Sequence, residues 1–416
     1  MNDNSNDKRN TPIILAQDYQ RAELKDNQKI EQTVATILED IRTNGDVAVN
    51  QWSEKIDGQK GQFIALKPFE DYPLEADLAL AIKTAYQRIK TFCEFQIKDL
   101  KDASFTDEYG QFGYCYVPIE RIGAYIPGGR FPLISTSLMT LVPAQVAGCP
   151  ERIACSPSTH PALLAAASLA GASQFIQLGG AQAIGALSYG YEKIKPVNMM
   201  VGPGNAYVNS AKAQLQHRTK IDTLAGPSEL LIYAEQLQNP EWIMYDALAQ
   251  AEHDPNAISL IVSTSQQLLE DLYTCTNASI AGQELLKNQQ ILFILAKNKS
   301  QAIELINDYA PEHLLVTDRD CDCSLFKNYG SLFIGENSAV AFGDYCTGPN
   351  HTLPTNAAGK NSGGLSVHQF LKVLSTQKVN DKGRQELAKT SALLAKAEGL
   401  AFHEKSAEVR TLLDDN

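Results

Sequence analysis

From about Ile122 to Ile334, short apolar runs alternate with segments of helical periodicity. The apolar runs are Arg152–Cys155, Phe175–Leu178, Asn198–Val201, Leu230–Tyr233, Ser259–Val262, Ile291–Leu295, His313–Val316 and Ser331–Ile334. The helical segments between them are Pro161–Leu169, Ala181–Leu187, Ala206–Leu215, Trp242–Ala251, Gln266–Leu272 and Gln301–Ile306. Parallel strands need crossover connections of this kind, so the pattern predicts an α/β protein with largely parallel sheets. About eight strands favour two Rossmann-like sheets over one.

The segments on either side of this region are helical. Before it, Lys29–Asn44 and Asp77–Asp99 carry apolar residues at helical spacing. After it, the tail from Gln369 contains two helical segments, Gly383–Glu398 and Glu404–Leu413. The tail has no strand partner in the neighbouring sequence, so we expect a small helical domain or a helix pair that packs on another subunit.

Charge and cysteine usage limit the classes of partner. A formal net charge of −12 argues against nucleic acid and anionic membrane surfaces. The first residues contain no apolar run of a signal peptide, and no stretch approaches the ~18 apolar residues of a membrane span. Eight scattered cysteines do not suggest a disulfide scaffold, and Cys321 and Cys323 have no second pair at metal-binding spacing. We therefore expect a cytoplasmic protein.

Three glycine clusters occur in the first half of the alternating region: Tyr125–Arg130, Leu178–Ala183 and Val201–Ala206. The second and third each follow a predicted strand and precede a predicted helix, where peptide N–H groups hold a pyrophosphate in many proteins. None is the G-x-G-x-x-G fingerprint, because the third glycine of the last cluster would fall at Tyr207. The pattern leaves two readings open, a nucleotide site or ordinary tight turns.

Two pairs of residues suggest metal binding or acid–base chemistry. Gln250 and His253 are three residues apart on a predicted helix, so an amide oxygen and an imidazole share one face. Glu312 and His313 are adjacent at the head of a predicted strand, where a carboxylate and an imidazole could act as two bases. For each pair taken alone, a structural role is the more common explanation.

Two further candidates lie later in the chain. Asp344 and His351 fall in a Gly/Pro-containing loop after a predicted strand, a common place for functional residues in parallel-sheet proteins. His403 follows Glu398, and Gly399 between them would end or bend a helix. By itself His403 reads as an exposed tail residue.

Read in order, the motifs of the chain resemble those of the histidinol dehydrogenase family from about Gln28 to Leu413. The matching segments are Gly123–Gly129, Pro143–Cys149, Gly179–Ile184, Gly202–Asn205, Ala225–Glu229, Gln250–His253, Ala310–His313, Gly348–Thr355 and Glu398–His403. Nine motifs in the same order make this resemblance specific.

The resemblance implies an enzyme that oxidises L-histidinol to L-histidinaldehyde and then to L-histidine with two NAD⁺, the last step of histidine biosynthesis. It implies catalytic roles for Glu312 and His313, with His313 taking the alcohol proton and Glu312 activating water. The positions matching the NAD⁺ contacts are Tyr125, Gln182 and Asn205. One zinc ion per active site would be held by Gln250, His253, Asp344 and His403. Substrate contacts would come from Ser228, Gln250, His253, His313, Asp344, Glu398 and His403.

The resemblance also implies an intertwined homodimer in which the other subunit supplies His403 and Glu398. We expect four parts: an N-terminal arm (1–27), a discontinuous first Rossmann-like domain (28–122 plus 229–368), a second Rossmann-like domain (123–228) and a helical C-terminal domain (369–416). Alternatives are a related dehydrogenase with another substrate, a zinc hydrolase using Glu312, and a non-catalytic binding protein. A thiohemiacetal on Cys149 is the alternative route for aldehyde oxidation. The missing H-E-x-x-H motif argues against the hydrolase.

Overall fold

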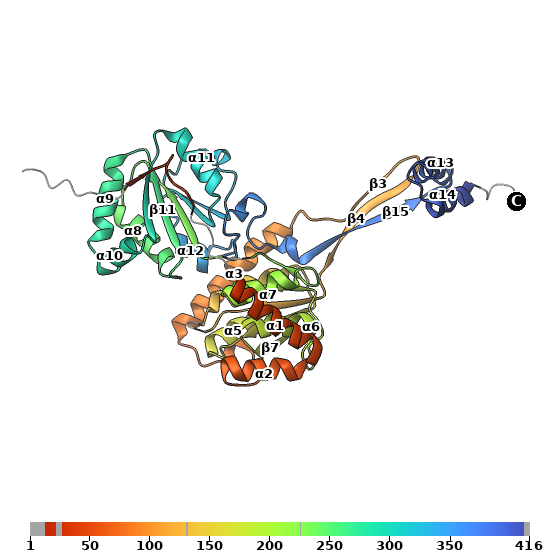
Figure 1. Cartoon of the computed structure of the whole chain (residues 1–416), viewed down its shortest axis with the longest axis horizontal. Helices are drawn as coiled ribbons and strands as arrows, with labels where there is room; N and C mark the ends of the chain where they lie inside the picture. Colours follow the sequence, from red (N-terminus) through yellow and green to blue (C-terminus); the bar gives the residue numbers. More distant parts are fainter. Residues whose placement is uncertain (1–12, 22–26, 130–131, 225, 412–416) are drawn as a thin grey trace, which may run out of the picture.

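The computed structural model describes residues 13–21, 27–129, 132–224 and 226–411. Two α/β lobes lie next to each other, and an arm of long strands carries a pair of helices away from both (Figure 1). Most of the expected N-terminal arm, Ala225 and the end of the last expected helix lie outside the described residues. No helix in the described ranges is long and apolar enough to cross a membrane.

The first lobe (27–101 and 119–221) is built on a six-stranded sheet. In spatial order its strands are β2 (Gln62–Ile64), β7 (Gln174–Gln177), β6 (Glu151–Ser156), β5 (Arg121–Tyr125), β8 (Met199–Val201) and β9 (Lys220–Ile221). Its helices are α1 (Gln28–Asn44), α2 (Asp46–Asp57), α3 (Ala76–Ile97), α4 (Ile134–Val146), α5 (Pro161–Leu169), α6 (Gly180–Tyr189) and α7 (Ala206–Leu215). All pairings are parallel except that of β2 with β7.

Two cores cover the two faces of this sheet. Alternate side chains of β5 point to opposite faces, so Ile122 packs with α3, α4 and α5, whereas Tyr125 packs with α1, α6 and α7. The apolar stripe of α1, which includes Ile37 and Ile41, lies in the same core as Ile184 of α6. The lobe is therefore a three-layer α/β/α sandwich.

This packing differs from the expected division of the chain. Residues 28–122 were expected to join residues 229–368, but α1, α2 and α3 cover the sheet of the first lobe. The segment after the second lobe also returns to the first, because Val367 and Phe370 are fully buried in its core. Periodicity showed that these segments have an apolar face, but it does not specify which sheet that face covers.

The second lobe (13–21 and 226–345) repeats the same architecture. Its strands, in spatial order, are β1 (Ile13–Leu15), β12 (Ile291–Leu295), β11 (Ile258–Ser263), β10 (Glu229–Tyr233), β13 (His313–Val316) and β14 (Ser331–Ile334), all parallel. Its helices are α8 (Pro240–Ala251), α9 (Gln266–Asn277), α10 (Ile280–Lys287), α11 (Lys299–Tyr309) and α12 (Val340–Tyr345). In both lobes the chain builds outward from a central strand, β5 or β10, and then crosses to its other side. This is the Rossmann-like arrangement that the sequence predicts.

The arm consists of three antiparallel strands and the two tail helices. The strands are β15 (Leu371–Val379), β4 (Gly110–Pro118) and β3 (Ala103–Thr106), and the helices are α13 (Asp381–Ala397) and α14 (Ala401–Glu408). The two helices were predicted, but the sequence indicated a purely helical domain from Gln369 and did not predict β15. β15 pairs along its whole length with β4, which lies more than two hundred residues earlier in the chain. A partner so distant cannot be recognised from the local sequence.

Candidate active site

The adjacent residues Glu312 and His313 are buried at the amino-terminal edge of the second sheet. His313 is the first residue of β13, and its side chain is 4% exposed. The backbone of Glu229, the first residue of β10, contacts both side chains. Its N–H donates to Glu312 Oε2 (2.9 Å), and its carbonyl oxygen lies 3.4 Å from His313 Nδ1. One peptide of the central strand therefore orients the two predicted bases.

The other ring nitrogen of His313 faces a carboxylate. His313 Nε2 lies 3.4 Å from Asp344 Oδ1, and His313 Nδ1 lies 3.6 Å from Glu312 Oε2. Burial lowers the pKa of His313, but Glu312 and Asp344 raise it more strongly, to about 10. Burial tends to raise the pKa of Asp344, yet the nearby histidines hold it below its ordinary value. Asp344 is thus an anion at neutral pH.

Arg21 supports this arrangement from the segment after β1. Its guanidinium bonds Glu229 Oε2 at 2.9 Å and lies over the ring of Tyr309, with 3.9 Å between Cζ and the ring centroid. Burial raises the pKa of Glu229 to about 7, and Arg21 opposes that shift. The sequence did not point to Arg21 because it lies 208 residues from Glu229, although Glu229 itself ends the Ala225–Glu229 motif.

Helices α8 and α12 and the turn after α8 bring three of the four predicted metal ligands to this edge. Gln250 and His253 were predicted on one helix, but α8 ends at Ala251 and His253 follows it. Asp246 of α8 accepts a hydrogen bond from the N–H of Val340 at the start of α12 (3.2 Å). Gln250 and Asp344 lie one turn further along each helix. His253 is close enough to contribute to the lowered pKa of Asp344. Gln250 is buried and His253 is exposed. Asp344 was expected in a loop, but it lies on α12, which runs back along the sheet to its amino-terminal edge.

The remaining predicted residues differ in position. Ser228 lies directly before β10, next to the acid–base pair, and is half-buried. Glu398 and His403 are exposed on the arm, far from the second lobe within one chain (Figure 1). Accordingly, the described residues contain no group of three or more His, Cys, Asp or Glu side chains that could hold a metal ion.

The three predicted nucleotide residues lie at the carboxyl-terminal edge of the first sheet. Tyr125 ends β5, Asn205 is the N-cap of α7 after β8, and Gln182 lies in the first turn of α6. The strand order reverses between β5 and β8, which is the switch point where Rossmann-like sheets bind ligands. Gln182 is fully buried, with its Nε2 bonded to Asp57 at 3.0 Å and its Oε1 lacking a partner in the described structure. A ligand donor would satisfy that oxygen.

A buried ion pair holds the loop between β8 and α7. Lys212 and Asp222 form a salt bridge in which each side chain is 1% exposed. Lys212 Nζ also donates to the carbonyl oxygen of Gly202 (3.0 Å), and Asp222 accepts from the Gly202 N–H (2.6 Å). Gly202 has φ 115°, and a Cβ there would collide with the carbonyl oxygen of Tyr125. Glycine is therefore needed at this position for both conformation and space.

His351 joins the two edges. Its Nδ1–H donates to the carbonyl oxygen of Asp344 (2.8 Å), and its Nε2 lies 3.3 Å from the hydroxyl of Thr136 in the first turn of α4. Burial lowers the pKa of His351, so the ring is neutral and accepts from Thr136. Because α4 follows β5, this contact connects the carboxyl-terminal edge of the first sheet to the amino-terminal edge of the second. The predicted nucleotide residues and the acid–base pair thus belong to neighbouring edges of the two lobes.

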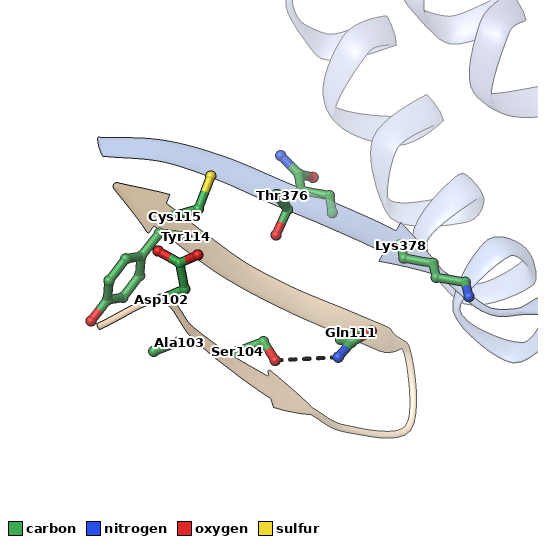
Figure 2. A pocket seen from close by; sticks show the side chains of 9 residues that line it. Asp102, Ala103, Ser104, Gln111, Tyr114, Cys115, Thr376 and Lys378 are labelled. Carbon is green, nitrogen blue, oxygen red and sulfur yellow. Dashed lines mark hydrogen bonds between the residues drawn. The ribbon is translucent and has the colours of Figure 1, made fainter. Parts of the chain in front are cut away.

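A separate hollow of about 360 Å³ lies on the arm (Figure 2). Polar side chains from β3, β4 and β15 line it, including Ser104 and Lys378, together with Asp102 directly before β3. Gln111 Nε2 donates to Ser104 Oγ at 3.2 Å. None of the predicted catalytic, metal or nucleotide residues lines this hollow. It is a surface of the arm and is distinct from the candidate active site.

Comparison with known proteins identifies the family to which this chain is similar. The family model for histidinol dehydrogenase matches residues 20–411. Histidinol dehydrogenase of Thermus thermophilus is 39% identical over 94% of this chain and 97% of its own length, and that of Methanosarcina mazei is 39% identical over 91% of each chain. The crystal structure of histidinol dehydrogenase from Elizabethkingia anophelis matches with a TM-score of 0.84 at 33% identity, covering 94% of this chain and 93% of that one.

The paired Rossmann-like lobes, the acid–base cluster between them and these matches place the chain among the α/β oxidoreductases. It belongs to the histidinol dehydrogenase family.

Proposed function

We propose that this protein oxidises L-histidinol to L-histidinaldehyde and then to L-histidine, using two NAD⁺ and one zinc ion per active site. The observation that carries this proposal is the position of Glu312 and His313. Both side chains are buried at the amino-terminal edge of the second sheet. Through the Thr136–His351 contact, this edge adjoins the edge of the first sheet that carries the candidate nucleotide residues. A substrate between the two edges would meet the bases on one side and a hydride acceptor on the other.

The hydrogen bonds of the pair support separate roles for the two residues. A backbone carbonyl can only accept, so the contact with Glu229 assigns the proton of a neutral His313 to Nδ1 and leaves Nε2 free to take a proton. His313 would act as the base toward the alcohol. Glu312 is held through one oxygen by the Glu229 N–H, which leaves the other oxygen to orient a water molecule for attack on the aldehyde.

The donor set suits zinc, which binds nitrogen and oxygen ligands in tetrahedral sites. From one chain it comprises the anionic carboxylate of Asp344, the amide oxygen of Gln250 and the imidazole of His253. When bound, the ion would anchor the amine and imidazole of the substrate and neutralise Asp344. With Asp344 neutralised, one of the two carboxylates that raise the pKa of His313 would lose its effect, which brings His313 closer to the range of a base at neutral pH.

The fourth proposed ligand, His403, requires a second subunit. It lies on α14 at the far end of the arm (Figure 1). The arm also exposes large apolar side chains: Phe105, Tyr114, Val373, Leu374, Leu393, Leu394 and Phe402. Such a surface on an extended, thin element is typical of an interface. We therefore propose a homodimer in which each arm reaches the other subunit and supplies His403 and Glu398 to its active site.

The direct test of the activity is an assay of the zinc-loaded protein with L-histidinol and NAD⁺. We expect two NADH for each histidinol consumed and L-histidine as the product. The His313→Asn variant should bind zinc and remain folded but lose turnover. Zinc-loaded wild-type protein that binds NAD⁺ but does not oxidise histidinol would refute the proposal.

Sharing of the site between subunits has its own test. His313→Asn and His403→Asn chains, each inactive alone, would be co-expressed with different affinity tags. Random assembly should restore about a quarter of wild-type activity, since half the dimers are mixed and each mixed dimer has one intact site. If both residues came from one chain, every site in the mixed dimer would carry one substitution and no activity would return.

A further inference from the structure

Two cysteines lie together in the loop that follows β13. The sulfur atoms of Cys321 and Cys323 are 3.9 Å apart, with Cys321 half-buried and Cys323 exposed. The loop leaves the carboxyl-terminal end of β13, whereas His313 begins the strand at the opposite edge of the sheet. The cysteine pair is therefore separate from the candidate active site, and neither the proposed catalysis nor the proposed metal site uses it.

The loop holds the two thiols close to each other. Asp322 accepts hydrogen bonds from the N–H (3.0 Å) and hydroxyl (2.6 Å) of Ser324, which fixes the short 3₁₀ turn Cys323–Leu325. Beyond the turn, Phe326 is 4% exposed in the core of the second lobe. Asn307 of α11 donates to the carbonyl oxygen of Leu325 (2.9 Å). The turn that carries the pair is thus fixed by hydrogen bonds within it and anchored to the lobe directly after it.

The surroundings assign different roles to the two sulfurs. Cys321 lines a small cavity of about 60 Å³ together with Tyr233, Glu235 and Lys299. Burial and the neighbouring thiol raise the pKa of Cys321 to about 11, and Lys299 partly opposes the shift. Cys323 is exposed, so an incoming reagent meets this sulfur first. Cys321 then lies behind it, within reach for a second exchange.

We propose that Cys321 and Cys323 form a reversible thiol–disulfide site that reacts with small-molecule disulfides. The thiolate of Cys323 attacks a disulfide RSSR, so an S–S bond to Cys323 forms and one RSH leaves with the proton lost by Cys323. The sulfur of Cys321 then attacks Cys323, displaces the second RSH with its own proton and closes the Cys321–Cys323 bond. Two cysteine sulfurs are oxidised, one RSSR is reduced to two RSH, and a thiol in excess reverses both steps.

The other six cysteines offer a built-in comparison. Cys93, Cys149 and Cys155 are buried, and burial raises the pKa of each thiol. Cys115, Cys275 and Cys346 are half-buried. Within the described structure, no two of these six sulfurs are in contact. Oxidation should therefore be confined to Cys321 and Cys323.

The test uses the full-length protein and oxidised glutathione. After incubation, free thiols are blocked with N-ethylmaleimide, and intact mass and peptide mapping identify the modified cysteines. Wild type should lose two of its eight thiols as a Cys321–Cys323 disulfide, and dithiothreitol should restore both. The Cys321→Ser variant should stop at one glutathione adduct on Cys323. The Cys323→Ser variant should react at least about tenfold more slowly, because the exposed nucleophile is gone.

Cys275→Ser is the matched control, because it removes a half-buried cysteine elsewhere in the same lobe and should react like wild type. The proposal would be overturned if wild type kept all eight thiols, if the lost thiols mapped to other cysteines, or if Cys321→Ser carried no adduct. Each readout is a mass, independent of histidinol turnover. The result therefore stands whether or not the proposed activity is correct.

Discussion

Replacing Lys212 with methionine tests whether the buried Lys212–Asp222 pair holds the loop at the end of β8. Methionine keeps the length of the side chain but removes the charge, so the carboxylate of Asp222 stays buried without its partner. Removing one member of a buried ion pair costs about 3–5 kcal/mol. For a urea m value of about 2 kcal/mol per M, the unfolding midpoint of the first lobe should fall by about 1.5–2.5 M.

The two tryptophans make this assay specific to one lobe. Trp52 packs in the core of the first lobe and donates to Asp40 at 2.7 Å, whereas Trp242 lies on α8 of the second lobe and is half exposed. In a Trp242→Phe background, fluorescence of Trp52 reports unfolding of the first lobe alone. The matched control is Lys60→Met, which breaks an ion pair with Glu54 in the same lobe, where the two side chains are 62% and 51% exposed. Exposed pairs contribute about 0–1 kcal/mol, so this midpoint should barely move.

A double variant separates the charge from the position of the loop. In Lys212→Met with Asp222→Leu, no charge is left buried, and most of the lost stability should return. Lys212→Met removes the hydrogen bond to the Gly202 carbonyl oxygen, and the double variant also removes the bond from the Gly202 N–H to Asp222. The KM for NAD⁺ should therefore be raised in the single variant and should remain raised in the double variant. A Lys212→Met midpoint equal to that of Lys60→Met would refute the reasoning about the buried pair. A normal KM in the double variant would refute the role of the pair in nucleotide binding.

Three further predictions concern the active site. Cys149→Ser should keep full turnover, because Cys149 is fully buried and the pKa of its thiol is raised to about 11. His313→Asn, by contrast, should lower kcat by a factor of about 10²–10⁴. An inactive but folded Cys149→Ser enzyme would favour a thiohemiacetal route. Arg21→Met should lower kcat about 10–100-fold with little change in zinc content, because it loosens the Glu229 peptide that orients both bases. An unchanged kcat would mean that the peptide is held in place without Arg21. Removing zinc with a chelator should abolish turnover but leave NAD⁺ binding intact, as measured by calorimetry. Recovery of turnover without added metal would contradict the proposed zinc ligands.

The sequence predicted the fold class because its signals are local. A strand or helix of the alternating region shows its period within ten residues, and β10, β11, β12, β13 and β14 lie within a residue or two of their predicted positions. The candidate residues for the chemistry came from the resemblance of short ordered motifs to a known family. The roles assigned to Gln250, His253, Asp344 and His403 stay predictions, and the structure of one chain agrees with them only in bringing the first three to one lobe.

What the sequence determined by itself was the presence of two Rossmann-like sheets, the family and the candidate residues for the chemistry. Tertiary structure alone decided which sheet α1, α2 and α3 cover, that β15 pairs with β4 to form an arm, and that Arg21 supports Glu229. It also decided that opposite edges of the two sheets adjoin at Thr136 and His351. The physical reason is the same in each case: an apolar face or an unpaired strand specifies that it needs a partner, and only the folded chain specifies which one.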